Sequence, residues 1–184
     1  MKTDRLEALV VEDDDAIREV LCDVLEGAGY SVRDARNGIH ALAILRSCEH
    51  GLVILLDNLL PGLNGSELLA ALDGNEVETA ANGNRCHISP ERHGWVLITA
   101  SPQRITPAFA ERLARLGAPV ITKPFDLTTL LAAVDQAALR LAPYEAIDQE
   151  RAQAMPHESE KREMGQEPQR SATAPVATTD NGAS

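Results

Sequence analysis

Five short predicted strands, most of them apolar, alternate with amphipathic stretches over the first 141 residues, and this alternation restricts the possible folds more than any other feature of the chain. These runs lie at residues 8–11, 30–33, 52–56, 96–98 and 120–122, and the second is weak because it includes Ser31 and Arg33. The third is apolar at every position, which is typical of a strand covered on both faces. Strands that alternate with helices favour a parallel sheet with helices on both sides. We therefore predict an α/β fold.

The stretches between the runs carry apolar side chains at helical spacing, and several have recognisable ends. Gly27 stops the first predicted helix. Thr106 is expected to cap the fourth helix, with Pro107 at its first position and Gly117 at its end. Asp126 is expected to cap the fifth. The sequence therefore predicts a (βα)5 unit over residues 1–141.

Residues 73–94 interrupt the alternation of strands and helices. These 22 residues have almost no periodicity, whereas a link from helix to strand usually takes about 2 to 6 residues. We interpret them as an inserted surface loop. Cys86, His87 and His93 suggest a zinc site there, but their irregular spacing and the lack of a second cysteine pair favour a solvated loop.

Residues 142–184 are acidic and poor in large apolar side chains, so we expect a disordered tail. The whole chain has a net charge of −11, which argues against binding to nucleic acid or to anionic membranes. The longest apolar run is too short to cross a bilayer, and no export signal precedes Glu12. Three scattered cysteines do not make a disulfide framework. We expect a cytoplasmic protein.

Chemically active side chains follow the predicted strands at their carboxyl ends, where open α/β sheets bind ligands. Glu12 and Asp13 follow the first strand, Asp57 the third, Thr99 the fourth and Lys123 the fifth. With strand order 2-1-3-4-5, the first and third strands are neighbours and their carboxylates meet in one pocket. Crowded carboxylates favour a hard cation such as Mg²⁺, which commonly also binds phosphate oxygens.

A pocket with these groups suits a phosphoryl group, because the cation and Lys123 offset negative oxygens and Thr99 donates a hydrogen bond. One carboxylate is then able to act as the nucleophile and form an aspartyl phosphate. Asp57 is the candidate, since it alone follows the central strand, just before the turn Leu60-Pro61-Gly62.

At these positions the chain resembles the receiver domain of two-component response regulators. The likeness covers residues 6–141 and rests on four motifs in family order: Val10-Val11-Glu12-Asp13-Asp14, Leu55-Leu56-Asp57-Asn58-Leu59-Leu60-Pro61-Gly62-Leu63-Asn64-Gly65, Ile98-Thr99-Ala100-Ser101 and Thr122-Lys123-Pro124-Phe125. Any one motif is weak evidence, whereas the ordered set at strand ends is specific. The resemblance implies a flavodoxin-like doubly wound sheet of order 2-1-3-4-5. Because the residues after 141 show no second globular pattern, we expect a stand-alone receiver without an output domain.

The resemblance also implies a role for each matched residue. Asp57 would accept a phosphoryl group from a histidine kinase or a phosphotransfer protein. Glu12, Asp13, Asp57 and the backbone carbonyl of Leu59 would hold Mg²⁺. Thr99 and Lys123 would contact the phosphoryl oxygens, and the Lys123–Pro124 bond would be cis. Phosphorylation would then change contacts with a downstream protein through the surface of the fourth helix, fifth strand and fifth helix, so that the chain acts as a switch and not as an enzyme on other substrates.

Two other functions remain as alternatives. Val120 stands where the family usually has an aromatic residue that reports activation, so the chain is alternatively a degenerate receiver, an interaction module independent of phosphorylation. A phosphatase that uses an Asp nucleophile is suggested by Asp13 and Asp15, but the small residues expected next are absent and Asp57 and Lys123 would have no role. Asp14 and Asp15 are expected to be the N-cap and a first-turn acid of the first helix, not ligands, since carboxylates are favoured at that end of the helix dipole.

Overall fold

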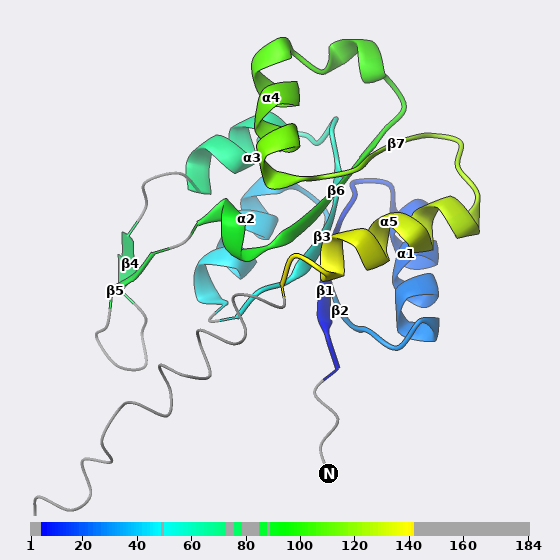
Figure 1. Ribbon diagram of the computed structural model, residues 1–184, viewed down its shortest axis with the longest axis horizontal. Helices are drawn as coiled ribbons and strands as arrows, with labels where there is room; N and C mark the ends of the chain where they lie inside the picture. Colours follow the sequence, from blue (N-terminus) through cyan, green and yellow to red (C-terminus); the bar gives the residue numbers. More distant parts are fainter. Residues whose placement is uncertain (1–4, 49, 73–75, 79–84, 88, 142–184) are drawn as a thin grey trace, which may run out of the picture.

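The structure, a computed structural model, describes residues 5–48, 50–72, 76–78, 85–87 and 89–141 (Figure 1). Its main sheet contains five parallel strands: β1 (Glu7–Val11), β2 (Ser31–Ala35), β3 (Val53–Asp57), β6 (Gly94–Thr99) and β7 (Val120–Thr122). Their spatial order is β2-β1-β3-β6-β7. Because β6 and β7 are the predicted fourth and fifth strands, the predicted order 2-1-3-4-5 is confirmed. The predicted tail, 142–184, lies outside the described residues.

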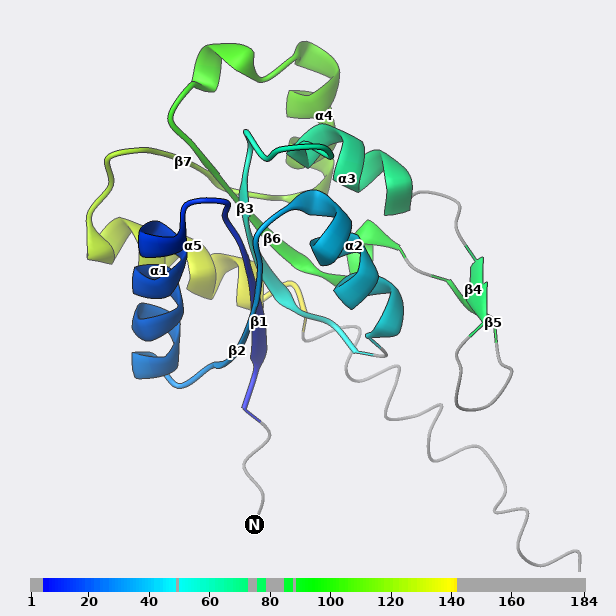
Figure 2. The same cartoon turned by 180° about the vertical axis from the view of Figure 1, so that it is seen from behind.

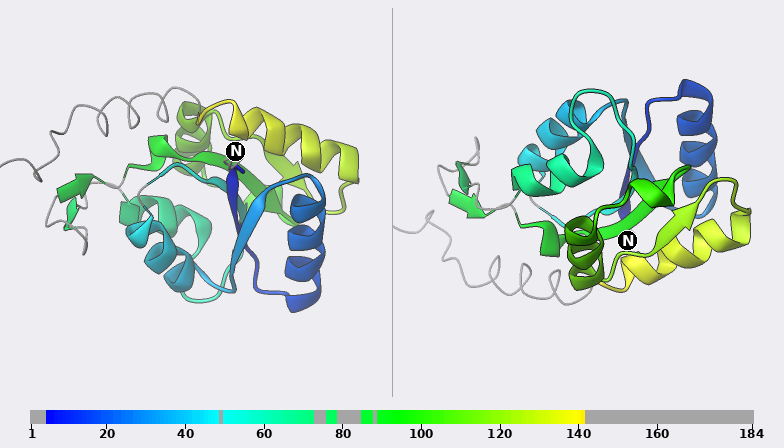
Figure 3. Two further views of the ribbon diagram at one scale, coloured as in Figure 1. Left: turned by 90° about the horizontal axis from the view of Figure 1, so that it is seen from below. Right: turned by 90° about the horizontal axis from the view of Figure 1, so that it is seen from above.

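Two helices cover one face of the sheet and three cover the other (Figures 1 and 3). The first pair is α1 (Asp15–Gly27) and α5 (Leu127–Ala138). The opposite face carries α2 (Gly38–Ser47), α3 (Gly65–Leu72) and α4 (Pro107–Leu116). Each face has its own apolar core, as the alternation of side chains along a strand requires. In β3, for example, Leu55 packs toward α1 and α5, whereas Leu56 packs toward the other three helices.

Local hydrogen bonds explain why the helices begin and end where they do. Asp14 accepts a bond from the Ile17 N–H, Thr106 from the Phe109 N–H and Asp126 from the Thr129 N–H. Each carboxylate or hydroxyl thereby satisfies a backbone donor that has no partner within its helix. Gly117 closes α4 at a φ of 61°, a left-handed conformation that favours glycine. The predicted caps of α4 and α5, and the capping role of Asp14, are confirmed.

The segment 73–94 is more structured than the sequence suggests. It contains an antiparallel pair, β4 (Glu76–Glu78) with β5 (Arg85–His87), and a 3₁₀ turn, η1 (Pro90–Arg92). The pair lies at one side of the molecule, away from α1 and α5 (Figures 1 and 2). Strand β6 begins at Gly94, two residues earlier than predicted.

The expectation that His93 is solvated is wrong. Its side chain is buried, its Nδ1 accepts a hydrogen bond from the Leu52 N–H at 3.2 Å, and its ring meets Trp95 edge to face. Trp95 in turn donates from Nε1 to the carbonyl of Pro90 at 2.8 Å. His93 therefore belongs to the packing that joins η1 to β3 and β6. The side chains of Cys86 and His87, the other members of the suggested zinc site, are not described.

Within the described ranges, none of the helices combines the length and the apolar character needed to cross a membrane.

Candidate functional site

The carboxylates predicted to meet do meet, at the carboxyl ends of β1 and β3. Glu12 follows β1 and Asp57 ends β3, and the register places Val11 opposite Leu56. Glu12 and Asp57 are buried, whereas Asp13 is exposed. Each of the three offers a carboxylate oxygen, and these oxygens lie within 4.8 Å of one another. The cluster is therefore compact, open to solvent on the side of Asp13, and made only of hard oxygen donors.

Lys123 joins the two buried carboxylates. Its Nζ lies 2.7 Å from Oε2 of Glu12 and 2.9 Å from Oδ1 of Asp57. The backbone holds this position, because the Lys123 N–H donates to the carbonyl of Thr99 at 2.8 Å. The Lys123–Pro124 bond is cis, as the resemblance implied. One ammonium thus faces a cluster of three carboxylates.

Burial and ion pairing have opposite effects on these groups. Burial raises the pKa of Glu12, although its hydrogen bond to Lys123 acts in the other direction. For Lys123, burial acts to lower the pKa, but hydrogen bonds to Glu12 and Asp57 outweigh it and the pKa is raised. The site therefore favours the charged form of Lys123, and the nearby ammonium offsets the cost of burying an ionised Glu12.

Leu59 contacts Asp57 in a way that the sequence did not indicate. Its backbone N–H donates to Oδ2 of Asp57 at 2.8 Å. Asp57 is thus held from two sides, by Lys123 at Oδ1 and by this N–H at Oδ2. The expected role of the Leu59 carbonyl as a metal ligand stays a prediction.

Thr99 lies beside the cluster without joining it. It ends β6, one residue after Ile98, which is the register partner of Asp57. Its side chain is buried, and its Oγ1 accepts a hydrogen bond from the Ser101 N–H at 3.0 Å. The hydroxyl is therefore near the site but bonded to its own loop.

Arg18 is a residue that the sequence reasoning missed. Its buried guanidinium donates to the Glu12 carbonyl at 3.0 Å and to Oδ2 of Asp34 at 2.9 Å, and it also pairs with Asp15. It thereby fixes the loop that carries Glu12 and Asp13. A cation within the first helix, just after four consecutive acidic residues, was the available signal.

An apolar groove of about 470 Å³ lies between α1 and the start of α5. Its lining includes Ile17 and Val20 from α1, together with Phe125 and Leu127. Val20 and Leu127 are more than half exposed. Ile17 lies two residues after Asp15 and Phe125 two residues after Lys123, so the groove is close in sequence to both parts of the carboxylate site.

Comparison with known proteins agrees with this geometry. A family model described as the response regulator receiver domain matches residues 8–82, the part that contains Glu12, Asp13 and Asp57. The chain carries a response regulator receiver domain. The matched family acts in two-component signalling as a switch domain.

Two curated relatives of the receiver domain are bacterial regulators. The uncharacterized transcriptional regulatory protein YkoG of Bacillus subtilis is 35% identical over 136 residues, which are 72% of this chain and 50% of that protein. The DNA-binding response regulator MtrA of Mycolicibacterium smegmatis is 41% identical over 68 residues, 37% of this chain and 29% of that protein. The chain spans half or less of these relatives. The expectation that it does not bind nucleic acid stays a prediction.

A solved structure is also similar to the receiver domain. It is a response regulator protein from Burkholderia pseudomallei with a phosphorylated aspartic acid, calcium ion and citrate. It is 26% identical with a TM-score of 0.52, and the match covers 78% of this chain and 74% of that one.

Proposed function

We propose that this chain is a phosphoacceptor signalling switch in which Asp57 takes a phosphoryl group from a histidine kinase or a phosphotransfer protein. The observation that carries the proposal is the position of Asp57: its carboxylate is buried at the end of the central strand and is oriented by Lys123 and by the Leu59 N–H. The phosphorylated aspartic acid of the Burkholderia relative supports the same chemistry.

In the transfer step, a carboxylate oxygen of Asp57 attacks the phosphorus of phosphohistidine. The new P–O bond forms as the P–N bond breaks, and the imidazole leaves with the electron pair and takes a proton from solvent. Lys123 then pairs with the added negative oxygens instead of with the free carboxylate. The Thr99 oxygen accepts from the Ser101 N–H, which leaves the hydroxyl proton to be donated to the phosphoryl group.

The carboxylates of Glu12, Asp13 and Asp57 fit Mg²⁺, since all three supply hard oxygen ligands at close range. When bound, Mg²⁺ neutralises charge on the transferred phosphoryl group. Arg18 has a positioning role, because it holds the loop that presents Glu12 and Asp13.

The groove between α1 and α5 is the proposed docking surface for the protein that donates the phosphoryl group. Its lining includes Phe125, two residues after Lys123, and exposed Val20 and Leu127 offer apolar area to a partner. A partner seated there would bring its phosphohistidine toward the carboxylate site.

A second candidate is an interaction module that does not depend on phosphorylation. It is favoured by Val120, a small side chain, 45% exposed, at the family's aromatic position on β7. Without an aromatic ring there, coupling between the phosphorylation site and the surface of α4, β7 and α5 would be weaker.

Acetyl phosphate with Mg²⁺ separates the two candidates. The switch predicts that intact-mass measurement shows one added phosphoryl group, and that chelation of Mg²⁺ or the Asp57→Asn change removes it. Asp23→Asn, a change of another aspartate on α1, serves as the matched control and should leave the mass gain intact. An unmodified wild-type chain would favour the interaction module.

A further inference from the structure

A second cluster of potential ligands lies at the opposite end of β1. Glu7 begins β1, Cys48 caps the end of α2, and His50 lies in the link to β3. One ligand atom from each lies within 4.8 Å of the other two. Glu7 begins β1 and Glu12 directly follows its last residue, five positions further on, so this cluster is about 16 Å from the carboxylate site.

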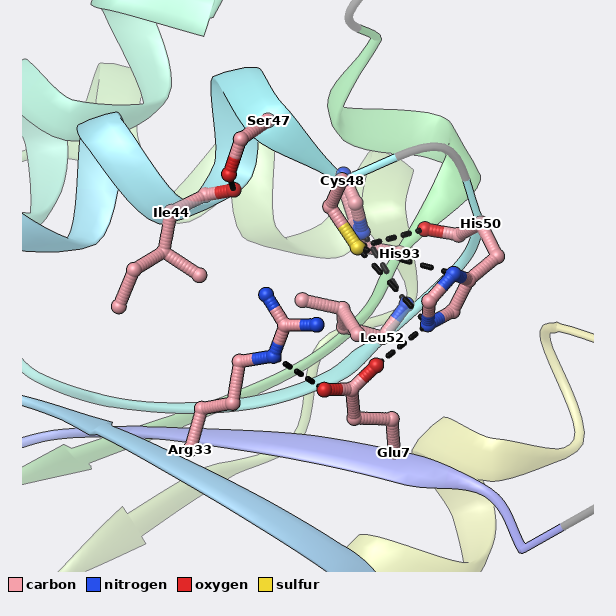
Figure 4. A network of polar contacts seen from close by, with 8 residues as sticks. All are labelled: Glu7, Arg33, Ile44, Ser47, Cys48, His50, Leu52 and His93. Carbon is pink, nitrogen blue, oxygen red and sulfur yellow. Dashed lines mark hydrogen bonds and ion pairs between the residues drawn. The ribbon is translucent and has the colours of Figure 1, made fainter. Parts of the chain in front are cut away.

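The three side chains turn toward one another (Figure 4). Oε2 of Glu7 is 2.5 Å from Nε2 of His50, and Sγ of Cys48 is 3.8 Å from the same nitrogen. Arg33 pairs with the other carboxylate oxygen, Oε1, and so directs Oε2 to the imidazole. The Cys48 thiol also donates to the backbone carbonyl of His50 at 3.5 Å, a bond that a metal-bound thiolate would give up.

These separations suit a tetrahedral metal ion. With metal–ligand bonds of about 2.0 to 2.3 Å, neighbouring ligands of Zn²⁺ lie about 3.3 to 3.6 Å apart. The distance between Sγ of Cys48 and Nε2 of His50 is already near this value. Glu7 and His50 would separate by less than about 1 Å, and the half-exposed side chain of His50 has room for that movement.

We propose that Glu7, Cys48 and His50 form a Zn²⁺ site, with one oxygen, one sulfur and one nitrogen ligand and a water in the fourth position. The thiolate ligand selects a borderline-soft cation over Mg²⁺, which keeps this site distinct from the carboxylate site. Arg33 pairs with Oε1 of Glu7, the oxygen that does not face His50, and so holds that ligand in place.

The bound ion would join three segments that the chain connects only through loops. Glu7 belongs to an inner strand of the sheet, Cys48 to the end of α2, and His50 to the segment that leads into β3. Zinc binding would therefore stabilise the folded state, because the unfolded chain does not hold the ligands together.

Titration of the metal-free full chain with Co²⁺, in saturating Mg²⁺, tests this site. Cobalt bound to a thiolate gives a near-ultraviolet charge-transfer band, which the carboxylate site cannot produce. We expect the band at one equivalent of Co²⁺ and its loss when Zn²⁺ is added. Cys48→Ala should abolish it, whereas Cys22→Ala, which changes the other cysteine whose side chain the structure describes, should retain it.

Competition with a chromophoric chelator gives the affinity for Zn²⁺. His50→Ala changes a half-exposed side chain, so the protein should stay folded, and it should weaken binding more than about 100-fold, since even the partners of metal ligands contribute about 10- to 100-fold. Zn²⁺ should also raise the Tm of the wild type but not of Cys48→Ala. The proposal is overturned if wild type gives no band, if Cys48→Ala keeps it, or if Cys86→Ala removes it.

Discussion

Single charged residues are buried in this protein beside groups that offset their charge or accept their hydrogen bonds. Lys123 contacts Glu12 and Asp57 at once, and Arg18 holds the backbone of Glu12. The strand-end position of Glu12, Asp57, Thr99 and Lys123 was predictable, because the apolar runs locate the strand ends. The contacts of Arg18 and the Leu59 N–H were not, because they depend on loop conformation, which residue spacing does not specify.

His93 gives a prediction about pH. Burial lowers the pKa of His93 to about 3, so the folded protein keeps the ring neutral. The unfolded chain binds a proton below about pH 6.5, and the free energy of unfolding therefore falls as the pH drops from about 6.5 toward about 3. The slope from this one group reaches about 1.4 kcal/mol per pH unit.

Urea denaturation of wild type and His93→Gln across this window measures the effect. The wild type should be more stable near neutral pH, and its advantage should shrink as the pH falls. His40→Gln, at an exposed position of α2, controls for the removal of a histidine elsewhere. Parallel curves for wild type and His93→Gln would contradict a neutral buried ring.

At the scale of elements, the structure differs from the sequence prediction mainly between α3 and β6. The apolar runs of β1, β3 and β6 pack on both faces, so period and composition were sufficient to locate them. The pairing of β4 with β5 was not predictable, since three residues in each strand leave almost no periodic signal. His93 likewise looked like a loop residue, because its burial depends on Trp95 and on the N–H of Leu52.

The contact between β6 and α5 gives a stability prediction. A Cβ at Gly94 would lie 2.2 Å from the carbonyl oxygen of Ala137, so one of the two elements must move. We expect Gly94→Ala to lower the free energy of unfolding by about 1 to 3 kcal/mol. Gly27→Ala, where a Cβ meets nothing within 4 Å, should be neutral or stabilising by up to about 1 kcal/mol. Equal midpoints in urea for the two variants would refute this packing.

The groove beside α1 gives a prediction about the phosphodonor. Val20→Glu places a charge in the proposed docking surface and should slow transfer from a phosphorylated histidine kinase at least about tenfold, as expected when an interface contact worth about 1.4 kcal/mol is lost. Phosphorylation by acetyl phosphate, which needs no protein contact, should not change. Ile39→Glu, an equally exposed apolar position on α2, is the matched control. Equal rates for both variants would show that the donor docks elsewhere.

At the scale of the whole molecule, one sheet carries two separate sites at its two ends. The carboxyl ends of the strands bring together Glu12, Asp57 and Lys123, and the beginning of β1 brings Glu7 to Cys48 and His50. The first site was predictable because parallel strands end at one edge of a sheet. The second was not, because its ligands come from a helix end and a loop with no shared spacing.

Asp57 itself is expected to carry the phosphoryl group, and reductive mapping checks this assignment. After reaction with acetyl phosphate and Mg²⁺, borohydride converts an aspartyl phosphate to homoserine, which peptide mass spectrometry locates. Homoserine is expected at position 57 and nowhere else. A phosphorylated chain whose reduced residue is Asp13 or any other side chain, with Asp57 intact, would contradict it.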